Sequence, residues 1–225
     1  MKNFTLFLLT LFLVSCNNDD DKNEVRKRIT DVEVVESDGY VQRSLHFNYN
    51  ADGNISEIIE EGEVEFTLSY DGNRLISIAS AYDTQPIQFI YTNNILSSIN
   101  DYGTELPVSY NSATKTYTIS EFALIKVNGR GMEQAQNTEG LLVFNADLSN
   151  SQKGALYGLP TESFFMIQLF TSSYYFLSEK PMTSMYVEGI SLTVNNVFDA
   201  DGYLEKMTLD LENDDSDLIV NYRYE

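Results

Sequence analysis

The stretch Phe47-Asn-Tyr49-Asn-Ala-Asp-Gly53-Asn-Ile55-Ser-Glu-Ile58 decides the fold, because it combines two short apolar–polar alternating runs with a tight turn between them. Such alternation is typical of half-buried β-strands. Gly53 supplies the positive φ that a tight hairpin or its bulge requires, and Asn and Asp side chains cap turns of this kind. The segment therefore predicts an antiparallel hairpin.

The same pattern recurs along the chain. Leu68-Ser-Tyr70-Asp-Gly72-Asn-Arg-Leu75-Ile-Ser-Ile78 is a clear copy, and weaker copies contain Tyr91 and Tyr110. The four tyrosines are separated by 21, 21 and 19 residues, and a last copy, Val197-Phe198-Asp-Ala-Asp-Gly202-Tyr-Leu204, follows after a gap. The positions to which we assign a structural role in the repeat are Tyr49, Gly53, Tyr70, Gly72, Tyr91, Tyr110, Phe198 and Gly202.

Repetition of one hairpin predicts a mainly β fold. We expect an antiparallel meander of repeated hairpins, arranged as a single large twisted sheet or an open barrel-like sheet, in one domain over residues 29–225. The rings of Tyr49, Tyr70 and Tyr91 are expected in the packed face of the sheet, with the following turns exposed. The odd 21-residue step then requires a bulge or an odd turn in each unit.

An irregular insert is expected over residues 121–190, between repeats at about 40–120 and 190–225. We predict one short buried helix around 161–177, capped by Thr161, with a strand as the alternative. Residues 129–140 and 145–154 are expected to form exposed loops.

These units resemble the YD repeats of RHS proteins, in which Tyr-Asp-x-x-Gly-x-Leu-x-x-Ile recurs. The segment Phe198-Asp-Ala-Asp-Gly-Tyr-Leu-Glu-Lys is also similar to a YDADGY-type motif near the C-terminus of uncharacterised lipoproteins of the Bacteroidota. The resemblance implies a sheet built from repeats in an envelope lipoprotein. Two features depart from it: the third and fourth copies lack the glycine, and Leu204 replaces a proline. The chain is also far too short to form a toxin-enclosing RHS shell.

The first fifteen residues predict a lipoprotein signal peptide. Lys2 is followed by an apolar run over residues 4–14, which is shorter than the roughly 20 residues of a membrane-spanning helix. The run ends in Leu-Val-Ser15-Cys16, which resembles the bacterial lipobox. Cleavage between Ser15 and Cys16 places the only cysteine of the chain at the mature N-terminus. Its thiol is the expected site of a diacylglycerol, and acyl chains contribute about 0.8 kcal/mol per buried methylene to membrane anchoring.

Residues 16–28 are expected to form a flexible acidic tether. Asp19-Asp20-Asp21 resembles the acidic motif that sends many lipoproteins of the Bacteroidota to the cell surface. We therefore expect a protein anchored by lipid in the outer membrane and displayed at the cell surface. A plain spacer and a periplasm-facing orientation stay open as alternatives.

Composition restricts the classes of partner. The whole chain has a formal charge of −20, and removal of residues 1–15, which contain Lys2 and no acid, makes the mature protein one unit more negative. Nucleic acid is excluded as a partner because phosphate binding needs a basic face. The one cysteine also excludes an internal disulfide. The oligomeric state is left open.

No catalytic constellation emerges from the sequence. His46, the only histidine, is expected on the solvent face of a strand, and the chain lacks the usual zinc ligands and any Cys-His or Ser-His relay. A glycosidase needs only two carboxylates, but the acids around one predicted turn are expected to point to solvent with ordinary pKa values. These candidates are Glu57, Glu60, Glu61, Glu63 and Glu65.

The sequence predicts no cofactor or metal beyond the covalent lipid at Cys16. Asn48-x-Asn50-x-Asp52-Gly53 imitates the start of a calcium loop, but Ile59 stands where the bidentate Glu is required, so we interpret it as a turn. Weak calcium binding at an acidic loop, Asp214-Asp215-Ser216-Asp217, stays open.

The favoured function is a non-catalytic envelope module that binds a glycan or protein partner or has a structural role. Strands rich in Tyr and Asn present aromatic and polar faces suited to such partners. Two alternatives remain: a carbohydrate hydrolase with paired carboxylates, and a surface inhibitor or immunity protein. Convergence of two acids in one pocket, with one of them buried, distinguishes the hydrolase from the binding module.

Overall fold

The structure is a computed structural model of the 225-residue chain. It describes residues 26–173, 175–210 and 217–225. The predicted signal peptide, Cys16 and most of the predicted tether lie outside the described residues, as does most of the loop proposed for calcium. In the described ranges, no helix is long and apolar enough to cross a membrane.

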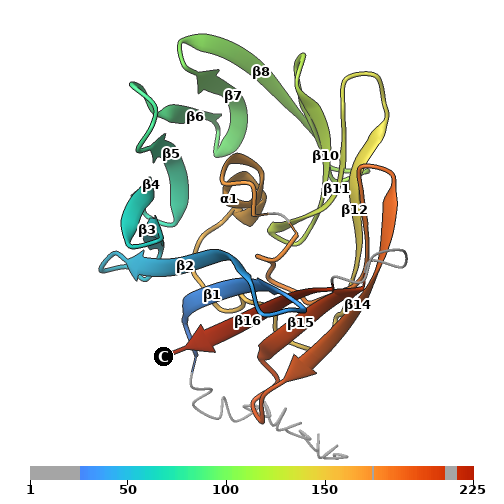
Figure 1. The fold of residues 1–225 in the computed structure, drawn as a ribbon. Coiled ribbons are helices and arrows are strands. Elements are labelled where there is room, and N and C mark those ends of the chain that lie inside the picture. The colour runs from blue at the N-terminus through green and yellow to red at the C-terminus, as the bar shows by residue number, and fades with distance from the viewer. Residues whose placement is uncertain (1–25, 174, 211–216) are drawn as a thin grey trace, which may run out of the picture.

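Sixteen strands in the described residues form one closed antiparallel barrel, in which each strand pairs with its neighbours in chain order (Figure 1). The first eight are β1 (Ile29–Glu36), β2 (Val41–Tyr49), β3 (Ile55–Glu60), β4 (Glu63–Asp71), β5 (Arg74–Ser80), β6 (Ile87–Thr92), β7 (Ile95–Asp101) and β8 (Thr104–Asn111). The second eight are β9 (Thr116–Ile119), β10 (Ala123–Asn128), β11 (Gly131–Gln136), β12 (Leu142–Leu148), β13 (Met182–Val187), β14 (Ile190–Phe198), β15 (Leu204–Asp210) and β16 (Leu218–Tyr224).

The predicted mainly β, antiparallel meander is confirmed, but the predicted openness is wrong. The barrel closes because β1 pairs with β16, from Ile29 opposite Tyr224 to Glu36 opposite Leu218. Closure gives every strand two neighbours and removes the unpaired edges that an open sheet would expose. The pairing joins the two ends of the domain, and the local repeat pattern carries no information about it.

The inner face of the barrel carries the hydrophobic core. Along β2, Leu45 and Phe47 are buried and His46 between them is exposed, as the alternation of a strand requires. The register carries this pattern around the barrel: Phe47 lies opposite Ile58, and Ile58 lies opposite Phe66. The predicted outward position of His46 is therefore confirmed, and its Nδ1 lies 2.9 Å from an Asp31 carboxylate oxygen.

A plug fills the barrel. We use this name for residues 149–181, which connect β12 to β13 and contain α1 (Phe164–Phe170) inside the ring of strands (Figure 1). Residues 164–168 are buried. The backbone N–H of Phe165 donates to the Arg130 carbonyl at one end of the barrel, and the ring of Phe170 stacks on Phe122 at the other. The helix thus runs along the inside of the barrel.

The plug is shorter than the insert that the sequence predicted. The expected irregular region 121–190 contains β10 to β13 and part of β14, and the loops expected at 129–140 and 145–154 contain β11 and the end of β12. The predicted helix exists but covers only residues 164–170 of 161–177. Thr161 does not cap it: the N-cap is Ser163, which makes no side-chain cap bond, while the Thr161 hydroxyl donates to Asn54.

The two ends of the barrel differ in their connections. The termini end holds the start of β1, the end of β16 and the β2–β3, β4–β5, β6–β7, β8–β9, β10–β11, β12–β13 and β14–β15 connections. The far end holds the other hairpins, beginning with β1–β2 and β3–β4. Because the meander alternates direction at every strand, this assignment follows from the strand order alone.

Candidate functional site

Charged side chains occupy the inner face at the far end. Residues directly opposite each other in an antiparallel pair share a face of the sheet. Arg43 lies opposite the buried Val34, and Glu60 lies opposite the buried Leu45. Both charged residues therefore project into the barrel, two residues beyond Leu45 and Ile58, the last buried residues of their strands.

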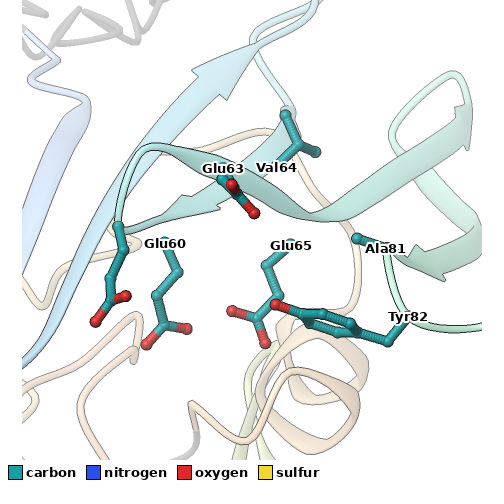
Figure 2. Close-up of a pocket in the computed structure, with 7 residues that line it drawn as sticks. Glu60, Glu63, Val64, Glu65, Ala81 and Tyr82 are labelled. Carbon is teal, nitrogen blue, oxygen red and sulfur yellow. The ribbon is translucent and has the colours of Figure 1, made fainter.

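A recess of about 680 Å³ opens beside them. Figure 2 shows the Glu60 and Glu65 side chains pointing into the same space, with the Tyr82 ring next to Glu65. Strand pairing is sparse at this point, since β5 and β6 pair only through Ser77 with Gln88 and Ile78 with Ile87. The residues that line the recess are Glu60, Glu61, Glu63, Val64, Glu65, Ala81 and Tyr82.

Arg43 holds Glu60 in a bidentate ion pair. Its Nε donates to Oε1 of Glu60 at 2.8 Å, and its Nη2 donates to Oε2 at 2.7 Å. Hydrogen bonding from Arg43 lowers the pKa of Glu60. The guanidinium also lies 5.6 Å from the centre of the Phe176 ring, so one residue of the barrel wall links the recess to the plug.

Glu65 has the opposite shift. A hydrogen bond with Glu60, together with burial, raises the pKa of Glu65 to about 7. The two shifts are opposite because close carboxyl groups oppose each other's ionisation, and Arg43 favours the ionised form of Glu60. The predicted solvated carboxylates with ordinary pKa values are therefore wrong for Glu60 and Glu65. Glu60 points inward because it is in phase with the buried Ile58 and lies opposite Leu45. Glu65 is the extra residue of a bulge, since Phe66 and Val64 lie opposite the successive residues Ile58 and Ile59.

The other acids at this hairpin behave as expected. Glu61 and Glu63 are exposed. Glu57 accepts a hydrogen bond from the Asn48 side chain, its partner on the outer face. Convergence is thus limited to the Glu60–Glu65 pair, with Glu61 and Glu63 at the margin of the recess.

A second recess at the far end is apolar. It has a volume of about 260 Å³ and lies where β13 to β16 meet the plug. Cross-strand pairs form its walls, including Met185 opposite Leu192 and Leu209 opposite Leu218. The residues that line it are Tyr175, Met185, Val187, Glu188, Ile190, Leu192, Leu209 and Leu218.

At the termini end, polar contacts join the plug to the turns, and two further recesses of about 200 and 310 Å³ open beside Arg26. Arg130 binds Glu179 at 2.6 Å, donates to the carbonyls of Leu159 and Thr161, and lies 4.6 Å from the Phe164 ring centre. Residues 26–28, the last of the predicted tether, also lie against the barrel here. For example, Lys27 binds Asp199 at 2.7 Å and Asp201 at 2.6 Å.

The repeat residues lie at the termini end. The rings of Tyr49, Tyr70 and Tyr91 pack against the core, and the hydroxyls of Tyr49 and Tyr91 donate to the carbonyls of Ile29 and Leu75.

The remaining repeat positions stay near the turns or the inner face. Phe198 is half-buried against the core, and the Tyr110 ring lies 4.5 Å from that of Tyr117. Gly53, Gly72 and Gly202 have φ of 84°, 61° and 80°, the region in which glycine avoids strain.

Turn chemistry accounts for the motif that imitates a calcium loop. The Asn50 side chain accepts from the backbone N–H groups of Asp52 and Asn54, and Asn54 is itself buried under the plug. Asp199 caps the later turn through Asp201 and Tyr203 in the same way. Among the described residues, no group of three or more His, Cys, Asp or Glu side chains is placed to hold a metal ion.

Comparison with known proteins extends only to the fold. The chain resembles a porin-like protein from Bacteroides vulgatus with a TM-score of 0.50 and 11% identity, over 88% of this chain and 99% of that one. A porin-like protein from Bacteroides uniformis gives a TM-score of 0.48 and 13% identity, over 88% and 98%. No protein-family model matches the chain, and no curated protein matches it. The likeness is one of fold.

The outer face of this barrel is polar. One row of cross-strand partners illustrates this, and every member is hydrophilic: Ser69, Ser77, Gln88, Asn100 and Glu105. Barrels that span a membrane have the reverse arrangement, with an outward apolar band about 25 Å tall and a polar interior. The outer face seen here is matched to water, and the apolar residues are used for packing the plug.

Several residues of both ends escaped the sequence analysis. Arg43 and Tyr82 at the far end belong to no motif, and neither do Arg130 and Gln168, whose side chains position the plug. The sequence offered one weak signal for Arg43. It lies two residues before Leu45, so it shares the inward face of the strand with Leu45 and Phe47.

Proposed function

We propose that this protein is a lipid-anchored envelope protein that binds a partner at the far end of its barrel and catalyses no reaction. The observation that carries the proposal is the separation of the two ends. The chain enters the barrel at the termini end, where the backbone of Arg28 pairs with that of Glu225 and basic side chains such as Arg26 line the recesses. The acidic recess and the apolar recess open at the other end.

Anchoring by lipid rests on the leader and on Cys16. A lipid attached there holds the termini end toward the membrane through the intervening tether. The far end then points away from the bilayer, where a partner has access to it. The polar outer face supports this arrangement because it needs no acyl chains around it. Kinship with the Bacteroidota lipoproteins suggested by the repeat, and display at the cell surface, are parts of the same proposal.

Chemistry at the recess favours binding over hydrolysis. The raised pKa of Glu65 favours a hydrolase as the second candidate, because a general acid must be protonated near neutral pH. However, Arg43 occupies both oxygens of Glu60, and a hydrogen-bonded pair leaves no space for a glycosidic bond between the two carboxyls, which glycosidases hold at least about 5 Å apart.

Cysteine labelling on intact cells tests the anchor and the orientation together. Wild-type protein should resist a membrane-impermeant maleimide because the Cys16 thiol is consumed by lipid. A Glu139→Cys variant at the far end should be labelled on intact cells, and Asp52→Cys at the termini end should be labelled more slowly. Labelling of wild-type Cys16 contradicts the lipid anchor. Labelling of Glu139→Cys only after lysis contradicts surface display.

A further inference from the structure

A ring of exposed apolar side chains surrounds the far end. Each of the seven far-end hairpins in the described residues carries one within or next to its turn, and Tyr82 is the most exposed at 82%. Isolated exposed apolar residues are ordinary, but a set gathered around one opening marks an interaction surface. We call this set the rim: Tyr40, Val64, Tyr82, Tyr102, Phe122, Leu141 and Ile190.

The termini end lacks such a ring. Its exposed large apolar residues, Ile76, Ile95, Tyr110 and Val197, lie on strands, as Val64 and Ile190 of the rim do. No described turn at this end carries one, whereas five rim residues lie within turns. Its short turns consist of small or polar residues, as in Asn-Asn at 93–94 and Ser-Ala-Thr-Lys at 112–115. The rim is therefore a property of one end of the barrel and not of the repeat.

Charge is also distributed unevenly between the ends. Among the described residues, Arg43 is the only Lys or Arg near the far end, and Glu60 already binds it. The other described basic residues lie in the plug, on the termini-end turns or in the halves of strands nearest that end. The far-end hairpins and their flanks carry the acids Glu36, Asp38, Glu60, Glu61, Glu63, Glu65, Asp83, Asp101, Glu105, Glu121, Glu139, Glu188, Asp210 and Asp217.

We infer that the far end binds a basic, partly apolar polypeptide segment, with cationic side chains in the Glu60–Glu65 recess and apolar side chains on the rim and in the Tyr175–Leu218 recess. This inference rests on the proposed function and names the class of its partner. Glu61 and Glu63, the exposed acids that line the Glu60–Glu65 recess, select a positive charge, and the apolar recess selects a side chain such as Leu or Phe. A polypeptide combines both chemistries at the spacing of neighbouring hairpins.

The structure disfavours two other occupants. An anionic bilayer would meet a surface of like charge, and the lipid anchor attaches at the opposite end. A second copy would have to bring its basic termini end to this acidic face. Two of the basic side chains there are already bound within the chain, since Lys27 binds Asp199 and Asp201 and Arg130 binds Glu179.

Binding of synthetic peptides to the lipidated full chain in zwitterionic nanodiscs tests the inference, with empty nanodiscs as the reference. The probe is a short peptide in which Lys and Leu alternate. Two matched peptides replace Lys by Glu or Leu by Ser. We expect the Lys–Leu peptide to bind at least about tenfold more tightly than either control, and added salt should weaken its binding.

Two variants locate the binding surface. Tyr82→Ser with Leu141→Ser and Ile190→Ser removes part of the rim, and Glu61→Lys with Glu63→Lys reverses charge at the acidic recess. Each set should weaken binding about tenfold. The matched control at the termini end, Ile95→Ser with Asp52→Lys, should leave affinity unchanged. All these side chains are exposed, so the variants should fold.

Several outcomes overturn the inference. Equal binding of the Glu–Leu peptide would show that the partner need not be basic. Unchanged affinity in both far-end variants would show that the peptide binds elsewhere on the protein. Association of the protein with itself, or with anionic vesicles, that is lost in the rim variant assigns the surface to a second copy or to a membrane. The maleimide experiment is independent: if Glu139→Cys is labelled on intact cells and no peptide binds, the proposed function survives and only the class of partner is wrong.

Discussion

The two ends of the barrel are built from the same hairpin unit, but their turns have different surroundings. At the termini end, turns such as 50–54 and 72–73 bond to the plug, and Asn54 is completely buried. At the far end, the short turns 61–62, 102–103 and 188–189 each consist of a Glu or Tyr followed by Gly, both at positive φ. Such turns suit two-residue hairpins and leave their side chains in solvent.

This difference shows that the repeat encodes the scaffold and that residues outside it give each end its role. Tyr49, Tyr70 and Tyr91 recur because the sheet needs them in equivalent places. Arg43, Glu65 and Tyr82 occur once each and make one end unlike the other. A binding face on a repeat-built barrel should therefore be sought where the repeat is broken.

The largest expected difference in stability is between a variant in the packed plug and a variant in the exposed rim. Phe164 is fully buried on α1, and Tyr82 is the most exposed aromatic residue of the rim. Phe164→Ala should reduce the free energy of unfolding by about 3–5 kcal/mol, as deletion of a buried aromatic ring does. Tyr82→Ala should change it by about 0.5 kcal/mol or less. Urea unfolding followed by circular dichroism measures both, and equal losses would show that the two ends are equally packed.

A smaller effect separates two kinds of turn at the termini end. The Asn54 side chain donates to the Gly72 carbonyl and the Asn73 side chain, and it accepts from Thr161. Asn54→Ala should cost about 1–3 kcal/mol because it leaves the buried Thr161 hydroxyl without this partner. Asn111 caps only its own exposed turn, so Asn111→Ala should cost about 1 kcal/mol or less. A loss at Asn111 as large as that at Asn54 would contradict the role of the plug.

The smallest effect concerns pH at the far end. In the folded protein the pKa of Glu65 is about 7, above its ordinary value of 4.5, because of its hydrogen bond with Glu60. Protonated Glu65 therefore contributes stability that is complete below about pH 4.5 and is lost as pH rises toward 7. Glu60 has a lowered pKa, so its own contribution is lost only at lower pH.

Glu65→Gln should flatten the dependence of stability on pH between these two values. At pH 8 the variant should be more stable than wild type by about 1 kcal/mol, after allowance for solvent screening. Unfolding curves across this pH range measure the change, and Glu63→Gln is the matched control at an exposed carboxylate. An unchanged slope in Glu65→Gln would mean that the two carboxyls do not oppose each other's ionisation.

The sequence was informative where the physics is local. Alternation and turn residues predicted the hairpins around Gly53 and Gly72, and the buried Phe-Phe-Met-Ile run predicted a short helix. The chain-wide pairing of β1 with β16 has no local signal, so the closed barrel was not predicted. The strands β10 and β11 were assigned to an insert because some of their inner positions are occupied by small residues, such as Ala123 and Ala135. Small residues weaken the alternation of large apolar and polar side chains that marks a strand.

The candidate site was harder to predict than the fold. Its Glu residues were identified, but the position of Glu65 depends on a bulge opposite Ile58 and Ile59, and Glu60 is held by Arg43 from the neighbouring strand. A shift of one residue in register exchanges the inner and outer faces. Sequence alone cannot locate such a shift within a run of alternating acids.

The β1–β16 seam also has a consequence for the order of events during synthesis. One edge of β1 stays unpaired until β16 has been made, because paired residues such as Val32 and Tyr222 lie almost the whole domain apart in the chain. Contacts of such long range slow folding. Until the barrel closes, the unpaired edge of β1 is exposed to other chains, and the charges of Asp31, Glu33 and Glu36 on β1 discourage strand-to-strand aggregation. The acidity of the protein thus protects it before the barrel exists.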